Sequence, residues 1–384
     1  MTRLLAEGGS PMEALKQFIN ALCAPEFFLP LCILIFAVCL RYYRTITKPY
    51  VAIPLGLLAL GGYVASMGDP NFLKIIKKPD NIPITMLILS VGYFMWLSLR
   101  RAALNDERLE RGQPLLEAGA DDKVLVWPDL VYTEFIALIL CTVFLVVWAI
   151  MLKAPLEQPA NPAAIPNPSK APWYFLGLQE MLVYFDPWIA GVLLPGLIIV
   201  GLIAIPFIDR NPRGNGYYTL RERPFAIAAF LFGFIILWDV LIVVGTFLRG
   251  PNWNLFGPFE YWDPHRPAAL LNVNISDVFW VVIPSKLGLS WWKPGLPDQA
   301  VGPVPAYLIR EAPGLVLLTI YFAVLPVALA KTVIRRMYDE MGFIRFVIFW
   351  VLVSWTAIMP IKMVLRWMFN IKYFAALTEF FFNI

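Results

Sequence analysis

Long runs of apolar residues recur along this chain, and polar, often basic, stretches separate them. Crossing about 30 Å of hydrocarbon takes roughly 20 residues of helix. Runs of about this length predict eight membrane-spanning helices, some of them short or tilted. They lie near residues 26–43, 50–67, 82–99, 131–152, 187–208, 225–247, 313–332 and 343–363.

The loops between these runs alternate in charge, which predicts the orientation of the chain. Lys and Arg are retained on the cytoplasmic side of a membrane, whereas acids have little influence. The loops after the first, third, fifth and seventh helices are basic and are predicted to be cytoplasmic. The other loops and both termini are then predicted on the outer side. Lys74, Lys77 and Lys78, in an outer loop, do not follow this rule.

The order of helices and loops predicts five parts. They are a three-helix membrane part (1–104), a mixed-charge cytoplasmic linker (105–126), a central region (127–249), a Trp- and Pro-rich outer loop (250–312) and a two-helix part with a tail (313–384). The fold class is an all-α integral membrane protein with long outer loops.

The outer loop 250–312 is too long to be a simple connection. Its tryptophans favour either a docking surface for a partner or a self-packed cap on the outer face. These are Trp253, Trp262, Trp280, Trp291 and Trp292. The tail from Lys362 to Ile384 mixes charged and aromatic residues, which predicts an interfacial helix on the membrane or against a neighbour.

Composition agrees with a membrane protein. Of the 384 residues, 59% are hydrophobic and 15% charged, and the mean hydropathy is +0.68. The net charge of +4 is spread over several loops, which excludes nucleic acid as an expected partner. Residues 1–20 lack an apolar core, so no cleavable signal peptide is expected. The four cysteines form no C-x-x-C pair, so they are interpreted as small packing residues.

His265 is the only histidine. A b-type haem with two imidazole ligands needs two, so such a haem would have to be held by a partner subunit. C-x-x-C-H, the attachment motif of c-type haem, is also missing from the sequence. His265 itself is interpreted as a surface residue of a loop.

One outer loop carries the candidate binding chemistry, in the sequence Lys170-Ala171-Pro172-Trp173-Tyr174-Phe175. Proline fixes backbone torsions, and the aromatic rings offer flat, stiff surfaces at the depth of the membrane interface. A flat, lipid-dissolved ligand such as a quinone would fit walls built from Pro172 to Phe175. An interfacial aromatic belt without a ligand is the alternative.

Carboxylates at membrane depth are costly and suggest proton handling. Asp239 lies in the middle of an apolar run, as a proton relay or as a hydrogen-bonding partner of a neighbouring helix. Glu180 and Asp186 follow the aromatic motif and are predicted nearer water, where either could pass a proton outward. Glu134 begins the fourth predicted helix.

Residues 127–249 resemble the C-terminal half of cytochrome b, which is a separate subunit IV in plastid and cyanobacterial quinol-oxidising complexes. The resemblance rests on a Trp-Pro-Asp helix entry, a proline-rich outer loop, the aromatic motif, the end of the next helix and a basic turn. These are residues 127–132, 155–166, 173–175, 205–209 and 221–224.

In that family the motif is Pro-Glu-Trp-Tyr, and its Glu is taken to accept a proton from quinol. Here Ala171-Pro172-Trp173-Tyr174 stands in its place. Proline cannot move a proton, so Glu180 or, as a weaker candidate, Asp186 would have to substitute. Otherwise the pocket binds quinone without oxidising it.

The resemblance implies a haem-free membrane subunit of a quinol:cytochrome c oxidoreductase that forms part of the outer quinol site. The chain would not be catalytic in isolation. Its partners would be a haem-bearing subunit similar to the N-terminal half of cytochrome b, a Rieske-type iron–sulfur protein, a c-type cytochrome and lipid, in a bacterial inner membrane. Two alternatives remain: a structural anchor with a degenerate quinone pocket, and a proton or solute transporter with Asp239 as its coupling residue.

Overall fold

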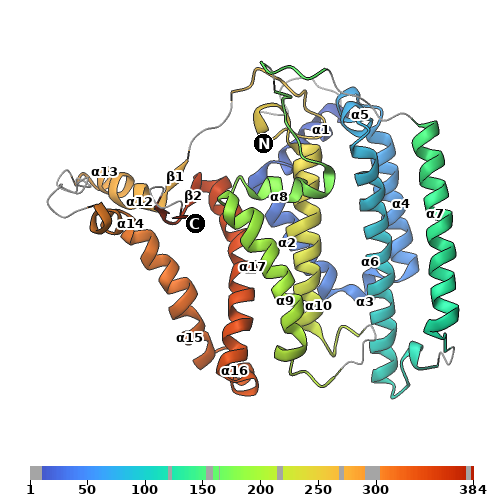
Figure 1. The fold of residues 1–384 in the computed structure, drawn as a ribbon. Helices are drawn as coiled ribbons and strands as arrows, with labels where there is room; N and C mark the ends of the chain where they lie inside the picture. Colours follow the sequence, from blue (N-terminus) through green and yellow to red (C-terminus); the bar gives the residue numbers. More distant parts are fainter. Residues whose placement is uncertain are drawn as a thin grey trace.

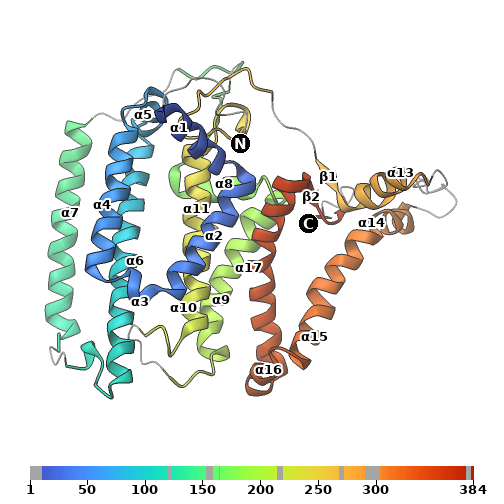
Figure 2. The ribbon, with the colours of Figure 1, turned by 180° about the vertical axis from the view of Figure 1, so that it is seen from behind.

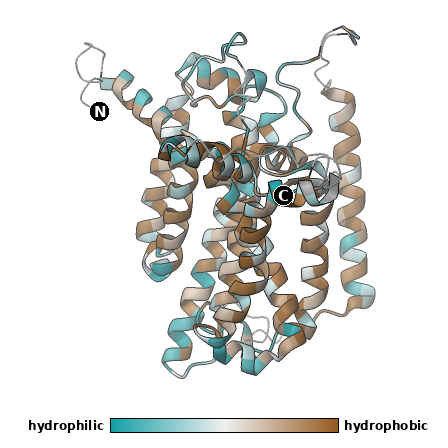
Figure 3. Ribbon diagram, turned by 90° about the vertical axis from the view of Figure 1, so that its left-hand side faces the viewer, coloured by the Kyte–Doolittle hydropathy of each residue, from teal (hydrophilic) through white to brown (hydrophobic). Residues whose placement is uncertain are grey.

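The computed structural model describes residues 11–119, 123–152, 159–163, 165–213, 219–267, 272–289, 303–377 and 382–384. Within these ranges, seven helical segments are long and apolar enough to cross a membrane, and a sharply bent helix pair makes up to eight. Figure 3 shows hydrophobic residues along the middle of the long helices and hydrophilic ones at their ends and in the loops. The predicted all-α membrane fold is confirmed.

The N-terminal part contains a bent helix pair and two long helices. The 82° bend separates α1 (Pro11–Leu22) from α2 (Pro25–Arg41). After these come α3 (Tyr43–Ile46), α4 (Pro49–Ser66), α5 (Pro70–Ile76) and α6 (Asn81–Glu110). Four of these helices begin at a proline, which is favourable because the first helical N–H has no intrahelical partner. The helix α6 continues to Glu110, so the first residues of the predicted linker are helical.

The central region contains three spans and the short helices that carry the motif. The first span is η2 (Val126–Leu130) with α7 (Val131–Met151), after the short η1 (Leu116–Gly119). Next come η3 (Trp173–Phe175) and α8 (Leu176–Met181). The second span is η4 (Ile189–Leu193) with α9 (Leu194–Ile208), and the third is α10 (Pro224–Leu231), η5 (Phe232–Asp239), α11 (Val240–Val243) and η6 (Val244–Leu248).

The outer loop contains η7 (Pro251–Trp253), β1 (Val273–Asn274), α12 (Ile275–Asp277), η8 (Val278–Val282) and α13 (Ile283–Leu287). Trp291 and Trp292 lie outside the described residues. The last two spans are formed by α14 (Pro303–Thr319), η9 (Ile320–Val324) and α15 (Leu325–Lys331), and by α17 (Phe343–Phe369). The short helix α16 (Arg335–Met341) lies between these two spans.

The tail is different from the predicted interfacial helix. Helix α17 ends before Asn370, whose φ of 56° is a left-handed conformation that stops a helix. Beyond it lie the short strands β2 (Ile371–Tyr373), β3 (Ala376–Leu377) and β4 (Phe382–Asn383). Strand β2 pairs in parallel with β1, and β3 pairs with β4. The prediction of a helical tail from Lys362 to Ile384 is therefore wrong beyond residue 369.

The four basic loops gather at one end of the helices. In Figures 1 and 2, α3, the end of α6, the segment before α10, and α16 all lie at the lower end. The motif helix α8, together with α1, α5 and the short strands near the C-terminus, lies toward the upper end. The predicted alternation of loops is thus reproduced, and the identity of the cytoplasmic end remains a prediction.

Two buried hydrophobic clusters hold the motif helix α8 against the other helices. The larger joins α2, α8, η5 and α17 and includes Leu29, Tyr184, Phe185, Ile236 and Met363. The smaller consists of Ile84, Leu176 and Ile242, with Trp173 and Trp238 packed against it. The smaller cluster lies directly beneath the aromatic motif and joins it to α6 and α11. Most other side chains of the spans are exposed, as expected where lipid covers a helix.

Candidate functional site

The aromatic motif forms a single tight turn that continues into α8. Trp173 to Phe175 form the 3₁₀ turn η3, and Pro172 precedes it in an extended conformation. The Gln179 side chain folds back on the loop: its Oε1 accepts from the Ala171 N–H at 2.8 Å, and its Nε2 donates to the Ser169 carbonyl at 2.9 Å. The loop is therefore held to the helix that follows it.

Two glycines allow α8 to approach the end of the third central span. A Cβ built on Gly245 would lie 3.2 Å from the Leu176 carbonyl oxygen, and one on Gly177 would lie 3.5 Å from Ile242 Cγ1. A larger residue at Gly245 would push against backbone, which cannot give way easily. This close packing sets the motif above α11.

A cavity of about 160 Å³ lies beside the motif. Its lining includes Lys170 and Trp173 from the motif loop, Lys78 and Asp80 from the turn before α6, and Asn81, the first residue of α6. An apolar cavity of about 150 Å³ can bind benzene, so this one has room for a single six-membered ring. The N-terminal three-helix part thus contributes one wall of the site, which the sequence did not indicate.

The four residues predicted to form the walls of the quinone site differ in their exposure and in whether they line the cavity. Trp173 is half-buried and lines the cavity. Pro172, Tyr174 and Phe175 are exposed and are not among the described residues that line it. The Tyr174 ring lies edge-on to the Trp173 ring, with their centroids 5.6 Å apart. The centroid of the Tyr174 ring is 4.6 Å from that of the Phe175 ring. The structure therefore places one wall in the cavity and leaves three side chains on the outer surface, where lipid or a partner can reach them.

Glu180 is fully buried, at 0% exposure, so the prediction that it lies near water is wrong. Arg249 donates to both carboxylate oxygens, from Nη2 at 2.6 Å and from Nε at 2.9 Å. The Tyr184 hydroxyl donates to the same carboxylate at 2.7 Å. A charge removed from water needs such partners. These three donors occupy the carboxylate and tie α8 to the end of the third central span.

Asp186 lies toward the C-terminal tail. Its Oδ1 accepts a hydrogen bond from the Tyr373 hydroxyl at 3.1 Å, and burial, aided by this carboxylate, raises the pKa of Tyr373 to about 12. The ammonium of Lys362 is buried nearby, 4.4 Å from the Phe185 ring centroid and 5.5 Å from that of Tyr373. Asp186 is thus engaged with the tail, and it is not among the described lining residues of the cavity.

Asp239 lies in the π-helical turn η5 and is half-buried. Its Oδ2 is buried and has no hydrogen-bond partner in the described part of the chain. The expected bond to a neighbouring helix is therefore not seen for this oxygen, and the relay role stays a prediction. His265 is exposed, as predicted for a loop residue, and Glu134 is exposed at the start of α7.

Lys170 is a member of the site to which the sequence assigned no role. Its Nζ donates to the Thr246 carbonyl at 2.8 Å and lies 4.9 Å from the Trp262 ring centroid. Burial, with the positive charges of Lys78 and Arg249, lowers the Lys170 pKa to about 7 against the opposing effect of Glu180. In the sequence, the only feature that could have pointed to Lys170 is its position two residues before Pro172.

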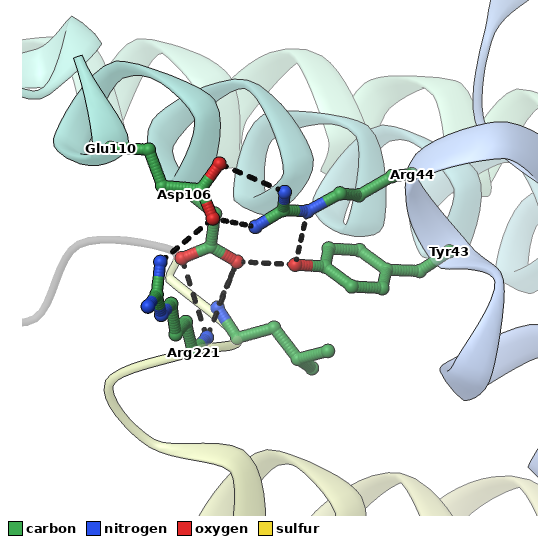
Figure 4. Close-up of polar contacts among 6 residues, drawn as sticks. Tyr43, Arg44, Asp106, Glu110 and Arg221 are labelled. Carbon is green, nitrogen blue, oxygen red and sulfur yellow. Dashed lines mark hydrogen bonds and ion pairs between the residues drawn. The ribbon is translucent and has the colours of Figure 1, made fainter.

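A second polar cluster at the opposite end joins the N-terminal part to the central region (Figure 4). Asp106 of α6 is fully buried and accepts from the Tyr43 hydroxyl at 2.7 Å. It also accepts from the backbone N–H groups of Leu220 and Arg221, both at 3.2 Å. Beside it, Glu110 pairs with Arg44 and with Arg221. Helices α3 and α6 are thereby attached to the turn before α10.

Residues 159–257 match a family model described as cytochrome b(C-terminal)/b6/petD. The match includes the motif, Glu180 and Arg249, and begins after residues 127–158, which hold the first marks of the resemblance. No solved structure matches the chain. The match indicates a cytochrome b-type membrane subunit of a bc- or b6f-type complex with other subunits. About a quarter of this chain, residues 159–257, therefore matches the cytochrome b C-terminal/b6/petD family, and the resemblance predicted from the aromatic motif and its flanking helices is confirmed for these residues.

Proposed function

We propose that this chain is a haem-free membrane subunit of a quinol:cytochrome c oxidoreductase and that its motif loop forms part of the quinol-oxidation site. The observation that carries this proposal is the position of Trp173. It belongs to the family-matched region and lines a cavity with room for one ring, at the end of the bundle opposite the basic loops. A quinol head group has a single flat ring or a fused pair, and stacking on an indole would orient it.

The redox centres would belong to other subunits. This chain has one histidine, so bis-histidine b haems require a partner that resembles the N-terminal half of cytochrome b. A Rieske-type iron–sulfur protein and a c-type cytochrome would complete the complex. Quinol supplies two electrons and two protons on oxidation. This chain would orient the ring, keep bulk water away and lead protons outward. In a bacterial inner membrane, the motif loop would face the periplasm.

The test is purification of a tagged chain from its native membrane in mild detergent. We expect a b-type haem band in the reduced-minus-oxidised spectrum, a histidine-rich membrane partner and an iron–sulfur or c-type subunit. The preparation should reduce cytochrome c with quinol. A colourless preparation that remains intact without such partners would overturn the proposal.

A transporter is the second candidate, and the unpartnered Oδ2 of Asp239 is the observation in its favour. Transport measurements in vesicles that contain only this chain test this candidate. Uptake of protons or solute driven by a pH gradient, and lost in Asp239→Asn, would support transport. Intact quinol turnover in a complex that carries Trp173→Ala would instead support a structural anchor.

A further inference from the structure

We propose that Lys170, in place of the family's glutamate, accepts the proton of quinol in the cavity beside the motif. This inference rests on the proposed quinol-oxidising function and deepens it. The position normally held by the acid is occupied by Pro172, which has no proton-accepting group. Lys170 lies two residues earlier and lines the same cavity as Trp173. The proposed proton acceptor and the ring-stacking residue therefore line the same cavity.

The surroundings of Lys170 suit a group that gains and loses a proton. Its hydrogen bond goes to a neutral acceptor, the Thr246 carbonyl. No carboxylate lies within ion-pair distance of its Nζ in the part of the chain that the structure describes, and the Trp262 face covers another side. A lysine fixed in a buried ion pair would remain an ammonium. The hydrogen bond to Thr246 instead positions Lys170, and no ion pair holds it in its charged form.

The charged groups around Lys170 favour its neutral form. Lys78, from the turn before α6, and Arg249, at the end of the third central span, are cations that disfavour a further positive charge. Glu180 of α8 acts in the opposite direction, but Arg249 already neutralises it. Asp80 also lines the cavity. Burial is the largest cause, and together with these cations it lowers the Lys170 pKa to about 7, well below the ordinary value of a lysine.

Glu180 is a less suitable proton acceptor than Lys170, because its carboxylate is held in a buried ion pair. Its carboxylate already accepts from Arg249 and Tyr184, and it has 0% exposure. The carboxylate is the counter-ion of the buried Arg249, and a buried cation needs such a partner. Glu180 therefore stabilises the site and places Arg249 near Lys170, and the exchange of protons falls to the lysine.

The proton step balances as follows. The amine nitrogen of Lys170 takes a proton from a quinol hydroxyl, so an O–H bond breaks, an N–H bond forms, and a quinol anion and an ammonium result. The iron–sulfur protein and the b haem of the proposed partner subunits would accept the two electrons, and the second hydroxyl proton would pass to water. The ammonium then releases its proton to the outer aqueous phase, which restores the amine.

The experiment uses the intact complex with three variants of this chain. Lys170→Gln removes the amine, and Lys170→Arg keeps a cation over Trp262 that cannot lose its proton. Lys77→Gln is the matched control, because Lys77 is an exposed lysine of the same outer turn as Lys78 and is not among the described lining residues. We expect quinol turnover to fall about 100-fold in both Lys170 variants and to stay at the wild-type rate in the control.

The pH dependence of quinol turnover is a second measurement, and it would not change if Lys170 had only a structural role. The amine is the active form, so wild-type turnover should rise through about pH 7, and this limb should be missing from the residual rate of Lys170→Gln. Labelling with a limiting amount of acetic anhydride, read by mass spectrometry, should show half-maximal reactivity of Lys170 near pH 7, several pH units below that of a free lysine side chain.

The outcomes separate this inference from the proposed function. Assembly of each variant is checked first, by its haem spectrum and subunit composition. The wild-type complex could oxidise quinol while the Lys170→Arg complex shows the same turnover rate and the same pH profile. This result would overturn the role of Lys170 and leave the proposed function intact. A wild-type complex with no quinol turnover would overturn both.

Discussion

Arg249 and Glu180 form a buried ion pair in which the guanidinium donates to both carboxylate oxygens across 69 residues of sequence. The pair joins the helix after the aromatic motif to the end of the third central span. It converts an acid that the sequence suggests for proton transfer into part of the scaffold of the site. Its removal should therefore affect stability before it affects chemistry.

Glu180→Gln should destabilise the protein by about 3–5 kcal/mol, because it leaves the Arg249 cation buried without its counter-ion. Unfolding of the purified complex, followed by tryptophan fluorescence, should show a lower melting temperature. The double variant Glu180→Gln with Arg249→Gln should recover part of the loss, since two amides bury no unpaired charge. Glu134→Gln, at an exposed position, is the control. Reduced turnover at an unchanged melting temperature would make Glu180 the proton acceptor.

Trp173→Ala should raise the KM for quinol about tenfold, because the half-buried indole is the motif ring that lines the cavity. Tyr174→Ala should have a smaller effect, since that ring is 48% exposed. Steady-state kinetics with a soluble quinol analogue measure both. Trp148→Ala, in the exposed face of α7, controls for loss of a membrane tryptophan. Equal effects at Trp173 and Tyr174 would show that quinol binds on the outer surface of the motif.

Asp106→Ala should loosen the attachment of the N-terminal part to the central region. It leaves the buried Tyr43 hydroxyl without its acceptor, at about 1–3 kcal/mol. It also removes the part-buried hydrogen bonds from the N–H groups of Leu220 and Arg221. Limited proteolysis should cut the turn before α10 faster than in wild type. Glu110→Gln removes a more exposed ion-pair partner and should have a smaller effect. Identical digestion of the Asp106 variant and wild type would contradict this role.

The stability of the chain should depend on pH through Lys170. Its pKa is about 7 when folded and near the ordinary 10.5 when unfolded, so the unfolded chain binds more protons between these values. Stability then rises with pH across this window. Lys170→Gln lacks this dependence, so it should melt at a higher temperature than wild type at pH 7, and the difference should shrink toward pH 10. A difference that stays constant with pH would contradict the lowered pKa.

The positions of the membrane spans could be predicted from the sequence because the bilayer imposes a minimum length of apolar helix. The run near residues 343–363 became α17, Phe343–Phe369, and the run near 225–247 became the span Pro224–Leu248. The bend between α1 and α2 and the strands of the tail were not predicted. A helix stop at Asn370 and strand pairing with Val273 depend on which segments meet in space.

The sequence was enough to predict the class of the protein, the approximate positions of its spans and the motif that relates residues 159–257 to cytochrome b. Which polar groups meet depends instead on how the helices pack. Glu180 with Arg249, Asp106 with Tyr43 and Lys170 with Thr246 are separated by 69, 63 and 76 residues. Helices that are apolar all round carry little information about which faces pack together. The partner of each buried charge therefore follows from the packing and not from the local pattern.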